Sequence, residues 1–256
     1  MEDALPKAKE AANRALVLDE SLADGHASLA FAVEIYDRDF RVAGQQFERA
    51  LALNPNHVNA RLWYGLMLVN LGRFEEARAQ FLTGLEADPL SASLRANVAT
   101  CDFFAGRYDD AIRLIRLEIE REPERAINHL ELGRVYVQKG DYKNGIESMR
   151  RAHTLAGDEP LFDAVLGYGL ARAGQRAEAE AIFERLMRES ATRRVPPYYL
   201  AVLCAGLDRP DDAFHWLDQV LRERHIGALS LGVEPELASL RSDPRFQDLR
   251  RRVGLI

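Results

Sequence analysis

The most informative part of the chain is residues 129–152, HLELGRVYVQKGDYKNGIESMRRA. It contains two apolar runs separated by Gly140, where a left-handed C-terminal cap would end one helix and turn the chain back. In the second run the small residue Gly145 lies one helical turn before the bulky Met149, so both belong to one helix face. In the first run Gly133 has no side chain and would let a second helix approach closely. The stretch therefore predicts two antiparallel helices joined by a tight turn.

These features recur along the chain with a period of 34 residues. A fixed period of this length is the signature of a repeat array, in which each unit packs only against its neighbours. Small residues permit close helix packing, and proline ends a helix because it lacks a backbone N–H and clashes one turn back. The periodic positions are Gly72, Gly106, Gly140 and Gly174; Pro55, Pro89 and Pro123; Gly65, Ala99, Gly133, Gly167 and Ala201; and Ala43, Ala77, Ala111, Gly145, Ala179 and Ala213.

The period and these residue types resemble the tetratricopeptide repeat, most fully in His129, Leu132, Gly133, Tyr136, Gly145, Met149 and Ala152. The resemblance implies an all-α fold, a right-handed superhelical solenoid of about six helix-turn-helix repeats with an N-terminal half-repeat and C-terminal capping helices. The implied boundaries are 1–22 for the half-repeat, 23–57, 58–91, 92–125, 126–159, 160–193 and 194–227 for the repeats, which together span 23–227, and 228–256 for the caps.

Two repeats depart from the pattern. The first is one residue longer, and we expect the extra residue in the turn at 36–40; the sixth has Asp208 where the turn glycine should be. After the sixth repeat we expect two short helices, at 236–240 and 243–253. Their apolar side chains would cover the face that the last repeat otherwise leaves in water.

Three segments show a more particular resemblance, namely PKAKEAA at 6–12, YDRDF at 36–40 and LRSDPRFQDL at 240–249. They resemble the C-terminal repeat region of bacterial multidomain signalling proteins, which carry a winged-helix regulator, a Ser/Thr kinase or a nucleotide cyclase upstream. This resemblance implies the interaction module of a signalling or transcription-regulatory protein, with Met1 as the start of a fragment. Arg38 stands where this group usually has an aromatic residue.

Composition and charge exclude several classes of function. With 47% apolar and 29% charged residues the composition is that of a folded protein. A net charge of −6 argues against direct nucleic-acid binding, which depends on Lys and Arg contacts to phosphate. Cys101 and Cys204 form no CxxC pair, and the first twenty residues lack the apolar run of a signal peptide. We therefore expect a cytoplasmic chain with no membrane-spanning segment.

No catalytic, metal or cofactor site is predicted. Gly140 and Gly145 have P-loop glycine spacing, but Ile146 and Glu147 follow instead of Lys and Ser or Thr. His26 and His129 occupy equivalent packing positions, and no further ligands converge with them at metal-site spacing. We therefore expect no catalytic residue, no metal, no cofactor and no enzyme activity.

The resemblance to tetratricopeptide repeats implies that the first helix of each repeat lines a concave binding groove. A mixture of aliphatic, aromatic and Arg residues there suits a protein or peptide ligand with apolar anchors and an acidic group. The alternative for an aromatic residue in the groove is packing against a neighbouring helix. The residues predicted to line the partner-binding groove are Leu62, Leu66, Val69, Asn97, Thr100, Phe103, Arg134, Tyr168, Arg172 and Tyr198.

The sequence thus predicts a non-catalytic protein-interaction scaffold that binds a peptide or protein segment. A carboxylate clamp like that of co-chaperone relatives is not expected, because only Asn97 fits its Lys, Asn and Arg pattern. The alternative function is a self-associating, regulatory segment that controls an attached effector domain. A homo-oligomer would be consistent with that alternative.

Overall fold

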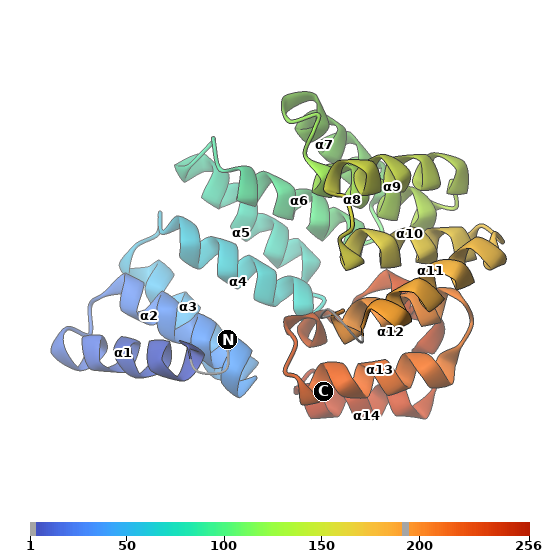
Figure 1. Cartoon of the computed structure of the whole chain (residues 1–256). Coiled ribbons are helices and arrows are strands. Elements are labelled where there is room, and N and C mark those ends of the chain that lie inside the picture. Colours follow the sequence, from blue (N-terminus) through green and yellow to red (C-terminus); the bar gives the residue numbers. More distant parts are fainter. Residues whose placement is uncertain (1–3, 191–194) are drawn as a thin grey trace. The chain divides into compact units, whose positions relative to one another are not determined.

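The computed structural model describes residues 4–190 and 195–256, and its regular secondary structure in those ranges is helical, with no strand (Figure 1). The chain divides into two compact units, Met1–Ala105 with Val253–Ile256 (unit 1) and Gly106–Arg252 (unit 2). The division falls between the two helices of the third predicted repeat. The first three residues of the predicted half-repeat and the predicted junction of repeats five and six at 193 and 194 lie outside the described residues.

Unit 1 is built from consecutive antiparallel helices. Its helices are α1 (Ala4–Leu18), α2 (Ala23–Ala32), the π-helix η1 (Val33–Asp37), α3 (Phe40–Leu53), α4 (Val58–Asn70), α5 (Phe74–Ala87) and α6 (Ala92–Phe104). Helix α2 packs on α3 and α4 packs on α5, as expected for helix-turn-helix repeats. Helix α4 also contacts α6, so first helices of successive repeats lie side by side.

Unit 2 continues the same architecture and ends in irregular structure. Its helices are α7 (Tyr108–Arg121), α8 (Ala126–Lys139), α9 (Tyr142–Ala156), α10 (Pro160–Arg172), α11 (Arg176–Glu189), α12 (Pro197–Gly206), α13 (Pro210–Arg222), the 3-10 helices η2 (Ile226–Ser230) and η3 (Pro235–Leu240), and α14 (Pro244–Val253), whose last residue falls in unit 1. The pairs α8–α9, α10–α11 and α12–α13 pack within their repeats, and α10 contacts α12 in the next repeat. Leu237, Leu240, Phe246 and Leu249 of the C-terminal region are buried.

The small residues are required by the close approach of paired helices. A Cβ atom added to Gly133 in α8 would lie 2.5 Å from Met149 Cγ and 2.9 Å from the carbonyl oxygen of Gly145 in α9. These distances are shorter than van der Waals contact, so only glycine fits without movement of the neighbours. The close packing predicted for Gly133 and Gly145 is confirmed.

The turn position has the same backbone conformation in every repeat. Gly140 has a φ of 89°, and the other periodic turn glycines are also in the left-handed region. Arg38 and Asp208, at 34-residue intervals before and after the glycine series, have φ values of 58° and 55°. The first and sixth repeats therefore keep the turn geometry although they lack the glycine.

The extra residue of the first repeat lies earlier than expected. It is accommodated in the π-helix Val33–Asp37, whose wider turn holds an additional residue, and the turn position at Arg38 follows in its usual register. The expected insertion at 36–40 overlaps this helix only at Tyr36 and Asp37. The extra length of the first repeat indicates that one residue is inserted. It does not show which helical turn contains the insertion.

Candidate functional site

Four of the predicted groove residues of unit 1 are partly exposed. Leu62 and Leu66 lie one turn apart on α4, and Asn97 and Thr100 lie one turn apart on α6, and all four are half-buried. Asn97 Nδ2 donates a hydrogen bond to the Ser93 carbonyl, and the Thr100 hydroxyl donates one to the carbonyl one turn earlier. Since α4 contacts α6, these side chains come from adjacent first helices.

The two remaining predictions for unit 1 need correction. Val69 is 3% exposed and Phe103 is 1% exposed, so neither side chain offers surface to a ligand. The Phe103 ring packs at 5.4 Å between centroids against Phe104. Helix register alone places both residues in the groove, but register does not distinguish the edge of a groove from the core beneath it.

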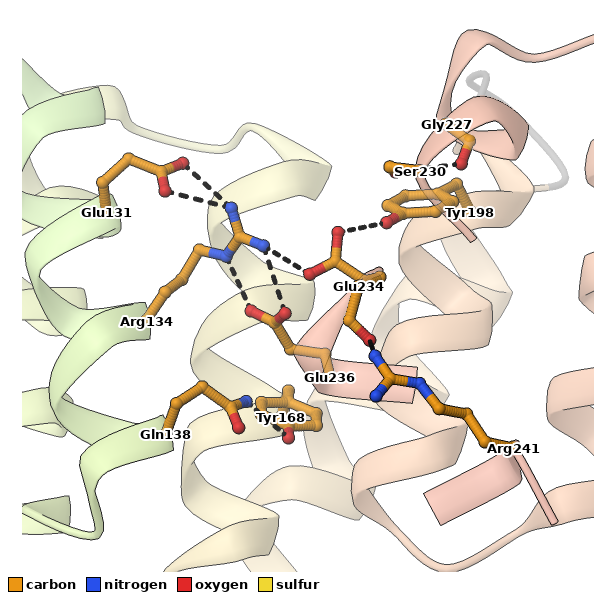
Figure 2. Close-up of polar contacts among 10 residues, drawn as sticks. All are labelled: Glu131, Arg134, Gln138, Tyr168, Tyr198, Gly227, Ser230, Glu234, Glu236 and Arg241. Carbon is orange, nitrogen blue, oxygen red and sulfur yellow. Dashed lines mark hydrogen bonds and ion pairs between the residues drawn. The ribbon is translucent and has the colours of Figure 1, made fainter. Parts of the chain in front are cut away.

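Arg134 is the centre of a carboxylate cluster in unit 2 (Figure 2). Its guanidinium group forms a bidentate pair with Glu236, with Nε to Oε1 at 2.6 Å and Nη2 to Oε2 at 3.1 Å. Nη2 also donates to Glu234 Oε1 at 2.8 Å, and Nη1 donates to both oxygens of Glu131 at 3.0 and 3.2 Å. Glu131 belongs to α8 itself, whereas Glu234 and Glu236 follow the last repeat. Arg134 thus binds a segment of its own chain.

Tyr198, at the start of α12, completes the binding of Glu234. Its hydroxyl donates a hydrogen bond to Glu234 Oε2 at 2.6 Å. The ring stacks on His225 with an interplanar angle of 13°. A Cβ atom added to Gly227 would lie 2.7 Å from Tyr198 Cδ2, so η2 lies directly against the tyrosine ring. Arg241 Nη2 donates to the Glu234 carbonyl at 3.0 Å and holds the backbone of the same segment.

The other predicted groove residues of unit 2 differ from each other in their surroundings. Tyr168 in α10 is 4% exposed, and its hydroxyl accepts a hydrogen bond from Gln138 Nε2 at 2.9 Å. Arg172, one turn further along α10, is exposed. Arg134, Tyr168 and Tyr198 therefore lie in one region. Tyr168 is buried and packs against neighbouring helices, whereas Arg134 and Tyr198 contact the chain's own C-terminal segment.

The pKa values of Glu234 and Glu236 are shifted in opposite directions by burial and by neighbouring charges. Burial and the adjacent Glu236 carboxylate raise the pKa of Glu234 well above its usual range. Burial opposes ionisation of Glu236 too, but attraction and hydrogen bonding to Arg134 outweigh it and lower the pKa of Glu236. Burial and the neighbouring carboxylate thus disfavour ionisation of Glu234, whereas Arg134 stabilises the ionised form of Glu236.

Comparisons with known proteins identify the repeat. A family model described as tetratricopeptide repeat matches residues 33–92 and 102–160, and a second model of the same description matches residues 160–185, so together they cover more than half of the chain. The chain belongs to the tetratricopeptide-repeat family. No curated protein sequence matches it.

Solved tetratricopeptide-repeat structures share the fold at low sequence identity. PilW, a type IV pilus biogenesis factor, is 15% identical with a TM-score of 0.59, and the match covers 97% of this chain and 91% of PilW. The Cut9–Hcn1 complex of the APC/C contains a chain that is 17% identical with a TM-score of 0.57, covering 97% of this chain and 52% of that one. A tetratricopeptide-repeat protein of Thermus thermophilus is 20% identical with a TM-score of 0.53, covering 77% and 97% respectively. These similarities concern the fold alone.

Both cysteines of this tetratricopeptide-repeat chain are free and buried. Burial raises the pKa of the Cys204 thiol to about 12, which disfavours the nucleophilic thiolate. The Cys101 thiol is buried and donates to the Phe74 carbonyl at 3.2 Å. In residues 4–190 and 195–256 no three His, Cys, Asp or Glu side chains are grouped to hold a metal ion. Within the same ranges no helix has the length and apolar character needed to cross a membrane.

Sequence reasoning missed the acidic half of the cluster. Arg134 was predicted to contact an acidic group, but its partners Glu234 and Glu236 lie 100 and 102 residues later. The available signal was the pair of Glu residues around Pro235 in a segment that follows the repeats. Nothing in the 34-residue period connects that segment to α8, because it is not itself part of a repeat.

Proposed function

We propose that the chain is a non-catalytic scaffold that binds a peptide or protein segment through its first helices. The observation that carries this proposal is the partly exposed surface formed by Leu62 and Leu66 of α4 and Asn97 and Thr100 of α6. Neighbouring first helices present aliphatic and polar side chains at one-turn spacing, an arrangement suited to apolar anchors flanked by hydrogen-bonding groups. The scaffold role would make the chain the interaction module of a cytoplasmic bacterial signalling or transcription-regulatory protein.

The proposal is tested by affinity capture with matched variants of unit 1. Leu66→Glu places a charge on the α4 surface, whereas Leu82→Glu places the same charge on α5, where Leu82 is 40% exposed. Partners retained by the unmodified chain and by Leu82→Glu, but lost from Leu66→Glu, support binding through the first helices. Capture of the same partners by all three chains, with each shown to be folded by circular dichroism, contradicts it.

The alternative proposal is a self-associating segment that regulates an attached effector domain. Helix pairs of a repeat array can stack on a second copy through their end surfaces. Val17 and Leu18, at the end of α1, are 86% and 88% exposed and would contribute to such a contact. Sedimentation at micromolar concentration separates the two proposals, because self-association predicts a dimer and the scaffold proposal predicts a monomer that gains mass only with its partner.

A further inference from the structure

A non-repeat segment of the chain occupies the predicted ligand position of unit 2. Residues 226–241 contain η2 and η3, and they reach the first helices α8 and α12 through Glu234 and Glu236 (Figure 2). The side chains of these two residues are 5% and 2% exposed, respectively. The segment therefore shows which kind of peptide this part of unit 2 accommodates.

The contacts describe a specific chemical pattern. Arg134 forms a two-bond fork with one carboxylate, while the carboxylate two residues earlier is shared between Arg134 and the Tyr198 hydroxyl. Pro235 separates the two acidic residues, and Leu237, which follows them, is fully buried. Arg forks and Tyr hydroxyls are well suited to carboxylates, and a buried leucine adds an apolar anchor. The site thus fits a segment with the pattern Glu-x-Glu-Leu that enters a 3-10 helix directly after its first Glu.

The positive charge of Arg134 remains paired when this segment is absent. If residues 226–241 leave, Arg134 keeps its ion pair with Glu131, which lies one turn earlier on α8 at 3.0 Å. With the segment bound, three carboxylates surround one guanidinium group, and their mutual repulsion reduces the gain from the ion pairs. The remaining ion pair with Glu131 and this repulsion lower the electrostatic cost of releasing the segment, whereas the burial of Leu231, Leu237 and Leu240 opposes release.

We propose that Arg134 and Tyr198 form a binding site for an acidic peptide of the pattern Glu-x-Glu-Leu, and that Glu234-Pro235-Glu236-Leu237 is an intrachain occupant that such a peptide displaces. This inference rests on the proposed scaffold function and adds the ligand chemistry and its regulation. The chain's own segment competes with the external ligand, so binding to unit 2 requires local opening. The surface of unit 1 is not subject to this competition.

The first test uses a full-length chain in which the occupant is weakened. Glu234→Gln with Glu236→Gln keeps the shape of the segment but removes both carboxylates. A fluorescent peptide with the sequence of residues 231–240, LGVEPELASL, is expected to bind this variant at least about tenfold more tightly than the control peptide LGVQPQLASL. Adding Arg134→Gln should abolish the difference, whereas adding Arg176→Gln, which changes an exposed arginine of α11, should leave it intact.

The second test uses the unmodified chain. Amide hydrogen exchange in residues 226–241 should be at least about tenfold faster than in α12, because the segment opens without global unfolding. Excess LGVEPELASL should increase exchange in the segment further, and LGVQPQLASL should not.

Several results would overturn the inference. If amide exchange in the segment is no faster than in α12, the segment is a permanent cap. Loss of the folded circular dichroism spectrum in the double variant would lead to the same conclusion. Equal binding of the two peptides by the folded double variant would show that the carboxylates are not recognised. None of these results bears on capture through α4 and α6 of unit 1, so failure here is distinguishable from failure of the scaffold proposal.

Discussion

Asp208 is a residue whose backbone conformation conflicts with its type. It has a φ of 55° at the position where four other repeats place glycine. A side chain in the left-handed region costs about 1 kcal/mol, and Asp and Asn are the residues that tolerate it best. The periodic turn imposes this conformation on whichever residue occupies the position.

We expect Asp208→Gly to raise the free energy of unfolding by about 0.5–1 kcal/mol, because glycine relieves the strain and Asp208 is exposed. Asp208→Ala should lower it, since alanine has the same strain and loses the polar side chain. Urea unfolding monitored by circular dichroism measures both. Stabilisation by Ala equal to that by Gly would contradict the backbone explanation.

Glu34 is a buried carboxyl group inside the π-helix of unit 1. It is 3% exposed and accepts a hydrogen bond from Asn70 Nδ2 at 3.3 Å. Burial raises its pKa from the ordinary value of 4.5 to about 8, against the smaller opposing effect of the Asn70 hydrogen bond. At neutral pH this side chain is therefore a neutral acid.

The raised pKa of Glu34 predicts a pH-dependent stability. Between pH 4.5 and about 8 the folded chain holds a proton that the unfolded chain releases, so stability falls as pH rises through this window. Glu34→Gln removes the ionisation and should stabilise the chain by about 1–3 kcal/mol near pH 9, with little effect near pH 4. The exposed residue Glu86 provides the control, because Glu86→Gln should show no such dependence. A constant difference between Glu34→Gln and the unmodified chain across pH would exclude this mechanism.

At the level of helix pairs, the contact between α8 and α9 depends on two glycines. Gly133 faces Met149 and the backbone of Gly145, and a side chain at Gly133 would overlap both. The methionine side chain can rotate away, but the carbonyl oxygen cannot move without separating the helices.

Gly133→Leu should therefore destabilise the chain by roughly 1–3 kcal/mol through overpacking. Glu147→Leu is the matched control, because it adds the same side chain at an exposed position of α9. The urea midpoints of the two variants give the comparison. An unchanged midpoint for Gly133→Leu would show that the helix register is wrong.

At the level of a complete unit, Arg134 links α8 to a segment that follows the last repeat. Arg134→Gln leaves Glu234 and Glu236 without their cation, and we expect a loss of roughly 2–4 kcal/mol in the free energy of unfolding. The triple variant with Glu234→Gln and Glu236→Gln should recover most of this loss, because no buried carboxylate then lacks a partner. Thermal unfolding of the single and triple variants tests the ion-pair explanation, which requires the recovery.

The division into two units is also a property that the repeat pattern does not show. The unit boundary after Ala105 lies inside the third predicted repeat, although the periodic residues Ala99, Gly106 and Ala111 continue through it without interruption. Periodicity reports which residues form helices and turns. It contains no information about where one compact unit ends.

The sequence alone was sufficient to predict the paired helices of the repeats and the turns at the glycine positions, because each depends on local rules. Glycine and proline at 34-residue intervals mark turns and helix ends, and small residues mark close contacts between helices adjacent in the chain. Arg134 and Tyr198 were also found from register, since first-helix positions follow from the period.

Only the tertiary structure decides which of the predicted groove residues are accessible to a ligand and which are covered by other parts of the chain. Glu234 meets Arg134 across 100 residues, and the pairing arises from burial, ring stacking on Tyr198 and charge attraction. The same holds for Val69 and Phe103, whose burial depends on the packing around them and not on helix register. A non-local contact of this kind leaves no periodic trace in the sequence, because its energy comes from groups brought together only by the packing of several repeats.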